Sequence, residues 1–163
     1  LKDMGIDKCI DYNTDDVEKE IIDFTNGKGV DLIIDPVGAK NWKLSYKVLG
    51  RMGKLIIYGD QNFVTGEKLN PITVFKEVMS MPKYKPTDLM AFNKTVMGYH
   101  LGRFQGYELK VKRSVKNLVS LIEKHDIHPV IDKVFPFEKA AEAYRHIQNR
   151  KNFGKVLLDF TKA

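Results

Sequence analysis

Short apolar runs alternate along the chain with segments whose apolar residues recur at helical spacing. The runs "VDLIID" (30–35), "KLIIYG" (54–59) and "KTVMG" (94–98) are typical of strands buried on both faces of a parallel sheet. Between the first two, "NWKLSYKVLG" (41–50) predicts a helix that buries its tryptophan and leucines. Strand, helix and strand joined by short connections predict right-handed crossover units, and therefore the α/β fold class.

The start of the chain and its second half add further elements. "KCIDY" (8–12) predicts a short strand, which is followed by a helix that Asn13 or Thr14 caps and "TNG" (25–27) ends. The other predicted elements are a helix at 72–80, a helical turn at 89–93, a long helix at 107–124, an extended segment at 128–137, a helix at 138–150 and a closing strand at 154–160.

The composition is that of an ordinary soluble protein. Hydrophobic residues make up 43% and charged residues 29% of the chain, and no apolar run approaches the roughly 20 residues that span a bilayer. The single cysteine, Cys9, excludes an intrachain disulfide, suits a reducing compartment and argues against a structural zinc. The net charge of +6 comes from lysines interspersed with acids, and the basic cluster at 108–116 lacks interleaved aromatics. Nucleic-acid binding is therefore not favoured.

The acid that ends the run at 30–35 raises two functional hypotheses. A strand-terminal Asp35 is typical of a magnesium-dependent nucleotide hydrolase, but the chain lacks the phosphate loop G-x-x-x-x-G-K-[ST]. We therefore expect Asp35 to cap or hydrogen-bond local backbone. A dinucleotide site would use the carboxyl ends of parallel strands, and three predicted strands end near Gly38, Gly59 and Gly98. The G-x-G-x-x-G fingerprint is absent and tight turns also need glycine, so the pattern alone leaves a cofactor site and plain turns open.

Several longer motifs point to a known family. The segments "IDYNTDD", "GKGVDLIIDPVG", "MGKLIIYG", "VMGYHLG", "HPVIDKVFPFEKAAEA" and "KNFGKVLLDF" occur in the order seen in the quinone-oxidoreductase branch of the medium-chain dehydrogenase/reductase superfamily. Within that branch the chain most resembles the vesicle amine transport protein family, through "NFVTGEKLNP", "GYHLG" and "PFEKAAEA". The resemblance covers essentially all 163 residues.

This resemblance implies a doubly wound, Rossmann-like fold of which the sequence is a C-terminal fragment. Residues 1–125 would be the later part of the NAD(P)-binding domain, and 126–163 a segment that packs with an absent GroES-like domain. In the sheet order 3-2-1-4-5-6, residues 8–12 would be the third strand and 30–35 the fourth. Because the first two strands would lie between them, we expect an exposed edge and a marginally stable or aggregating chain. The opening "LKDMG" (1–5), which has the form of a helix end, agrees with a fragment.

The resemblance also carries over a set of cofactor-binding candidates. They follow the predicted third to sixth strands or precede the last one: Tyr12, Asn41, Tyr58, Gly59, Asp60, Gln61, Gly98, Tyr99, His100 and Asn152. Four of them have a structural alternative. Tyr12 would otherwise be a surface tyrosine packed on a helix, and Asn41 a helix N-cap. His100, whose residue type suits a general acid near neutral pH, would otherwise be a hydrogen-bonded structural or cofactor-packing group, and Asn152 a turn residue. No catalytic residue is assigned, and no metal is implied.

The implied chemistry is hydride transfer from NADPH to a quinone or enone without zinc. It is implied for a cytoplasmic protein that is a homodimer at full length, and the fragment alone is expected to be inactive. The alternative is a peripheral membrane or scaffold protein with weak catalysis, on vesicles or the mitochondrial outer membrane. The charge of +6 and the loop aromatics Phe63, Tyr84 and Phe104 would suit that alternative.

Overall fold

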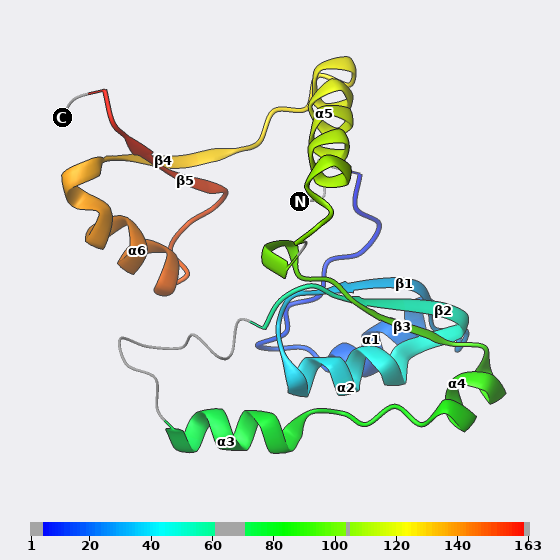
Figure 1. Cartoon of the computed structure of the whole chain (residues 1–163). Coiled ribbons are helices and arrows are strands. Elements are labelled where there is room, and N and C mark those ends of the chain that lie inside the picture. The colour runs from blue at the N-terminus through cyan, green and yellow to red at the C-terminus, as the bar shows by residue number, and fades with distance from the viewer. Residues whose placement is uncertain (1–4, 61–70, 104, 162–163) are drawn as a thin grey trace. The chain divides into compact units, whose positions relative to one another are not determined.

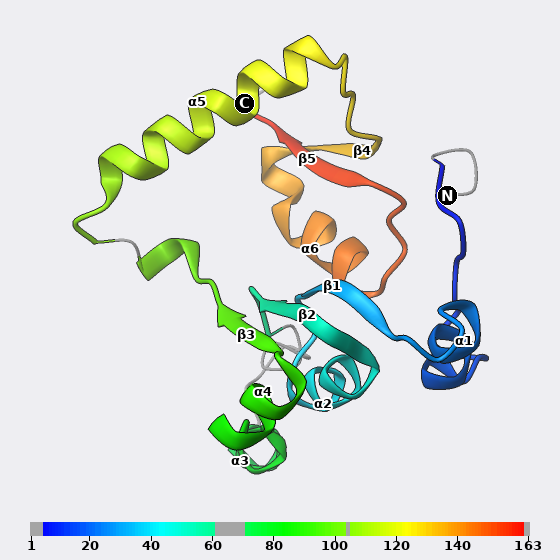
Figure 2. The ribbon, with the colours of Figure 1, turned by 90° about the vertical axis from the view of Figure 1, so that its right-hand side faces the viewer.

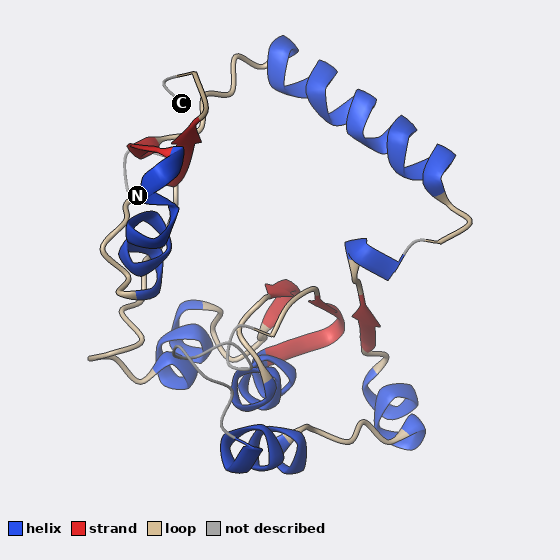
Figure 3. Cartoon of the chain, turned by 60° about the vertical axis from the view of Figure 1, so that its left-hand side comes forward, coloured by secondary structure: helices blue, strands red, loops and turns tan. Residues whose placement is uncertain are grey.

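Two parallel sheets organise the chain, one in each of the units into which it divides (Figure 1). The computed structural model describes residues 5–60, 71–103 and 105–161. The first unit spans Leu1–Leu101 and the second Gly102–Ala163. Both units contain helices as well as strands (Figure 3). The domain boundary expected at residue 125 refers to the longer family fold and stays a prediction.

The first unit contains a three-stranded sheet whose strands lie in sequence order. β1 (Val30–Asp35) pairs with β2 (Leu49–Ile57), and β2 pairs with β3 (Thr95–Gly98), in parallel throughout. Figure 2 shows the order β1-β2-β3. The three apolar runs therefore form adjacent parallel strands, as predicted. The prediction that these strands are buried on both faces was wrong, because Leu32, Ile34 and Met97 leave one face half-exposed. β2 begins earlier than predicted because Leu49 already pairs with Val30, ahead of a register shift.

One helix supplies most of the packing against this sheet. The helices of the unit are α1 (Val17–Phe24), α2 (Ala39–Val48), α3 (Pro71–Ser80) and α4 (Pro86–Phe92). α2 contacts β1, β2 and α3, and Figure 1 shows it between the sheet and α3. Ala39, Trp42 and Val48 of α2 are buried together with Leu55 of β2. The face of the sheet that meets α2 is therefore the core of this unit.

The N-cap of α1 is Asp16, so the prediction of Asn13 or Thr14 was wrong. A carboxylate oxygen of Asp16 accepts a backbone N–H of the first helical turn at 3.1 Å. Asn13 is held in the preceding turn instead, where its N–H and its side-chain amide both donate to Asp11 Oδ1 at 2.9 Å. The predicted stop at 25–27 is confirmed, because the backbone enters the left-handed region there.

The strand predicted at 8–12 does not form, so this prediction was wrong. The segment has no strand conformation, and the described strands of this unit pair only with one another. A strand is stabilised by hydrogen bonds to a neighbour, and the family resemblance implies that the third strand pairs with a strand this sequence does not contain. The apolar pattern of 8–12 is therefore insufficient to order it alone.

The second unit contains a parallel pair of strands joined by a helix. Its elements are α5 (Glu108–Lys124), β4 (Ile131–Pro136), the short 3-10 helix η4 (Phe137–Lys139), α6 (Ala140–Gln148) and β5 (Lys155–Asp159), while η3 (Leu101–Arg103) follows β3. α6 contacts both strands, and Phe135 and Ala143 are buried between them. None of the described helices combines the length and apolar character that crossing a bilayer requires.

Candidate functional site at the carboxyl edge of the first sheet

The three strands of the first unit end at the same edge of the sheet. The register aligns Asp35 of β1 with Ile57 of β2, and Ile57 with Gly98 of β3. Beyond the ladder, the Tyr58 N–H donates to the Asp35 carbonyl at 3.2 Å, and the Tyr99 N–H donates to the Ile57 carbonyl at 2.8 Å. The segments that follow the strands therefore lie side by side. Ligands bind at such carboxyl ends in open α/β sheets.

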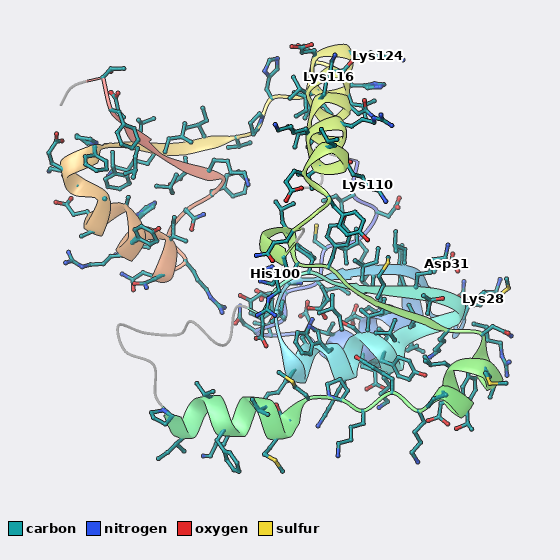
Figure 4. The ribbon with its side chains drawn as sticks, viewed as in Figure 1. Lys28, Asp31, His100, Lys110, Lys116 and Lys124 are labelled. Carbon is teal, nitrogen blue, oxygen red and sulfur yellow. The ribbon has the colours of Figure 1, made fainter. Side chains whose placement is uncertain are left out.

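Labelled side chains show the two ends of the sheet in Figure 4. His100 lies at the carboxyl edge, while Lys28 and Asp31 lie at the opposite end. His100 is exposed, and its imidazole makes no hydrogen bond within the part of the chain that the structure describes. The structural alternative that we considered for His100, a hydrogen-bonded group, is therefore not what the described residues show.

Asp35 fixes the turn that follows β1. Its side chain is only 1% exposed, and it accepts the Val37 N–H at 2.8 Å, Asn41 Nδ2 at 2.7 Å and Ser45 Oγ at 2.6 Å. The prediction that Asp35 hydrogen-bonds local backbone is confirmed. Since buried carboxylates are tolerated only when their lone pairs are satisfied, these three donors explain how an acid sits in the core.

Asn41 is held by Asp35 and is not a helix N-cap, so that alternative was wrong. The N-cap of α2 is Gly38, whose carbonyl accepts the Trp42 N–H at 2.9 Å. Asn41 and Ser45 are four residues apart on α2, and this spacing places both side chains on one face of the helix. Sequence reasoning missed Ser45, although that spacing relative to Asn41 was available to find it.

Two glycines shape the space at this edge. A Cβ added at Gly59 would lie 3.1 Å from the Pro36 carbonyl oxygen, so a side chain there would press the loop after β2 against the turn after β1. A Cβ added at Gly98 would meet nothing within 4 Å. Gly59 therefore serves close packing of two loops, whereas Gly98 leaves open space at a strand end, where backbone can approach a ligand.

The remaining candidates fall into three groups. Tyr58 and Tyr99 have half-exposed rings on the segments after β2 and β3, and Asp60 is half-buried. Tyr12 lies in the turn before α1, where it is exposed. Gln61 lies outside the described residues. The structure thus brings together the candidates of the three strand ends, and Tyr12 lies on a separate turn.

Asn152 belongs to the second unit. Its side-chain amide donates to the Gly154 carbonyl at 2.9 Å, in the turn before β5. The turn role that we considered for Asn152 is confirmed, and its role toward a cofactor stays a prediction.

Tyr46 and Tyr84 form a ring pair that sequence reasoning did not predict. The rings of Tyr46 and Tyr84 lie 5.0 Å apart between centroids, and both hydroxyls are buried. The expectation that Tyr84 is an exposed loop aromatic was therefore wrong; Phe63 and Phe104 lie outside the described residues. Lys94 donates to the Tyr46 carbonyl at 3.0 Å and lies over its ring. Burial lowers the pKa of Lys94.

Replacing Tyr84 with phenylalanine is expected to remove a loss of stability at high pH. Burial, the charge of Asp35 and the neighbouring Tyr46 raise the pKa of Tyr84 from 10.0 to about 12. Above pH 10 the unfolded chain releases this proton while the folded chain keeps it, so stability falls as the pH rises toward 12. Urea unfolding followed by Trp42 fluorescence across this range measures the slope. Tyr144→Phe, at an exposed tyrosine, is the control, and equal slopes in Y84F and the unmodified chain would contradict the prediction.

Metal-ligating side chains do not gather in the described parts of the chain. No group of three histidine, cysteine, aspartate or glutamate residues there could hold a metal ion. Cys9 is exposed and unpaired with another thiol.

Comparisons with known proteins agree with this architecture. A family model described as zinc-binding dehydrogenase matches residues 4–158. The synaptic vesicle membrane protein VAT-1 homolog of Rattus norvegicus is 39% identical over 158 residues, which are 97% of this chain and 39% of the relative. A quinone oxidoreductase from Pseudomonas syringae pv. Tomato DC3000 superposes with a TM-score of 0.71 at 19% identity, over 96% of this chain and 44% of that one. A mycobacterial protein solved in complex with NADPH gives a TM-score of 0.70 at 24% identity, over 96% and 45%.

These matches confirm the predicted α/β Rossmann-like fold and the resemblance to vesicle amine transport proteins. The chain spans about two fifths of the length of the curated relative, 39% by alignment. The chain belongs to the zinc-binding dehydrogenase family of the medium-chain dehydrogenase/reductase superfamily.

Proposed function

We propose that the whole protein is an NADPH-dependent oxidoreductase that transfers a hydride to a quinone or enone. The observation that carries the proposal is the carboxyl edge of the first sheet, where three aligned strand ends leave open space at Gly98. The related fold of a protein complexed with NADPH and that of a quinone oxidoreductase support the choice of cofactor and acceptor.

The residues at this edge fit a nicotinamide cofactor. Tyr58 and Tyr99 offer half-exposed rings and backbone groups, and the missing side chain of Gly98 leaves space between the chain and a ligand. Asp35 holds the turn before α2 and the amide of Asn41 in place. When bound, NADPH would supply the hydride. The residues named here, and the further candidates Gly59, Asp60, Gln61 and His100, would bind and orient it. Tyr12, on a separate turn, and Asn152, in the second unit, are the other candidates for cofactor contact.

The description of the family implies zinc, and the described residues do not fit a zinc site. Zinc sites use three or four cysteine, histidine or carboxylate ligands that converge on one point, and no such group exists in the described parts of the chain. The proposal therefore routes no step through a metal. A metal analysis of the whole purified protein tests this part of the proposal.

Gly98→Val is expected to weaken NADPH binding about tenfold or more without unfolding the sheet. The added side chain would enter space that is empty of protein atoms, and valine suits a strand. NADPH fluorescence titration of the whole protein measures the dissociation constant. Thr95→Val, at the opposite end of the same strand, is the matched control and should bind normally. Normal NADPH affinity in G98V, or no NADPH binding by the unmodified protein, would overturn the assignment.

Membrane attachment is the second candidate, and the name of the rat relative favours it. Of the three aromatics that suited it, Tyr84 is packed against Tyr46 and is not available to a membrane surface. Liposome co-sedimentation of the whole protein separates the two candidates.

We propose further that the whole protein is a cytoplasmic homodimer that binds no nucleic acid.

A further inference from the structure

The second unit contains an open polar hollow of about 240 Å³, called the cavity below, that the proposed function does not use. Residues of β4, of α6 and of the segment after α6 line it. Its polar lining consists of Lys133, Glu142, Arg145, His146, Asn149 and Lys151. Four of these residues, at positions 142, 145, 146 and 149, follow i, i+3, i+4 and i+7 spacing. They therefore share one face of α6 and its C-terminal end.

Three lining residues are cations without an acid within 4 Å in the described parts of the chain. Lys133, Arg145 and Lys151 appear in none of the ion pairs there. The ammonium of Lys133 instead lies 4.8 Å from the centroid of the Phe135 ring. All three side chains are exposed and line the same hollow, so an anion placed there would be attracted by three positive charges at once.

The acid in the lining does not neutralise these cations. The carboxylate of Glu142 lies 3.8 Å from the ammonium of Lys139, which is outside the cavity. Both groups are exposed, so the pair is weak. The cavity nevertheless keeps three permanent positive charges against two acids, Glu142 in the lining and the neighbouring Asp132, whose charge also interacts with Lys133.

His146 is oriented by an acid on β4. Its Nε2 lies 2.7 Å from an Asp132 carboxylate oxygen, and the backbone N–H of Phe153 also donates to Asp132. The bond from His146, together with that from Phe153, lowers the pKa of Asp132. Asp132 is therefore the acceptor and Nε2 the donor. The imidazole ring also packs against Phe135, with 5.9 Å between the ring centroids.

The chain turn at the end of α6 positions Lys151, the third cation of the lining. Arg150 adopts a left-handed backbone conformation, with φ 53°, which turns the chain back after the helix. The Lys151 N–H then donates to the His146 carbonyl at 3.2 Å. Lys151 is thus brought to the cavity by the backbone of the helix end.

We propose that this cavity binds a phosphate dianion, as inorganic phosphate or as the phosphate group of a small monoester. Arginine presents a planar fork of donors that matches phosphate oxygens, and lysines add point charges. The side-chain amide of Asn149 adds a directional donor. A single carboxylate would leave most of these charges unmatched. The volume is below the roughly 300–1,000 Å³ of pockets for drug-sized ligands, so the ligand is small.

Hydrogen exchange of the whole purified protein tests this site. Exchange of peptides covering 143–152 is measured in potassium phosphate, in glycerol 3-phosphate and in potassium chloride of equal ionic strength. A ligand that binds only the folded state slows exchange by the factor 1 + [L]/Kd, which is about tenfold at ten times Kd. We expect slowing with both phosphates and none with chloride.

Vesicles of phosphatidylcholine with phosphatidic acid distinguish the source of the phosphate. If the soluble phosphates slow hydrogen exchange, the ligand of the cavity is a free phosphate. If only the phosphatidic acid vesicles slow it, the ligand is a lipid headgroup. No slowing with any phosphate source overturns the site.

Variants separate a built site from general charge. Arg145→Gln and Lys151→Gln should each raise the apparent Kd about fivefold or more, because each removes a charged donor worth about 1 kcal/mol or more. Lys155→Gln removes one exposed charge of the same unit outside the cavity and should leave Kd unchanged. Lys151 lies beyond the helix, so K151Q remains informative if R145Q unfolds α6. Equal slowing in K151Q, K155Q and the unmodified chain overturns the proposal.

Discussion

Asp35→Ala is expected to lower the free energy of unfolding of the first unit by about 3 kcal/mol. The substitution leaves the Val37 N–H, the Asn41 amide and the Ser45 hydroxyl without their acceptor. A buried donor that loses its partner costs about 1–3 kcal/mol. Removing a buried charge returns part of this cost, which is why the sum of the three donors overstates the effect.

The single tryptophan makes the measurement direct. Trp42 lies on α2 beside the residues that Asp35 holds, and it is 9% exposed. Urea unfolding of dilute chain, followed by Trp42 fluorescence, gives the midpoint and slope. Asp31→Ala is the matched control, because Asp31 is an exposed acid on the same strand (Figure 4). Asp35→Asn keeps one acceptor oxygen and should fall between the two. Equal midpoints for D35A and D31A would refute the role assigned to Asp35.

The outcome at Asp35 shows what the sequence could predict about this site. The apolar run at 30–35 and the acid at its end predicted a buried strand whose last side chain bonds local backbone, because both features are local. The donors to Asp35 from α2 depend on how that helix packs against the sheet, which local sequence does not determine. Of these, Asn41 was a candidate through the family resemblance alone, and Ser45 was missed.

Long-range packing accounts for two of the predictions that were wrong, those for Tyr84 and for residues 8–12. Tyr84 follows a proline and a lysine in a loop, and nothing local indicates that its ring meets Tyr46. The segment at 8–12 has the pattern of a strand but no neighbour to pair with. The cations around the cavity in the second unit come from a strand, a helix and a helix end, so their convergence is visible only in the folded chain.

The 163-residue chain by itself is expected to self-associate through β1, and Ile34→Lys is expected to prevent this. β1 pairs with β2 on one side, and its other edge has no partner in the described parts of the chain. Leu32 and Ile34 are 50% and 60% exposed. The register places Ile34 beside Ile56, and Ile56 beside Met97, on the face opposite the core. An unpaired edge next to an apolar face is a template for pairing with another chain.

Sedimentation velocity at concentrations on the order of 10 μM measures the association, because exposed edges associate in this range. We expect the unmodified chain to sediment faster than an 18.7 kDa monomer, and I34K to sediment as a monomer. Met90→Lys makes the same change at an exposed apolar residue of α4 in the same unit, and this variant should still associate. Lysine at the edge acts by charge repulsion and by the cost of burying an ammonium. An unmodified chain that stays monomeric and melts cooperatively at high temperature would show that the edge of β1 is protected, and that the fold does not depend on further strands.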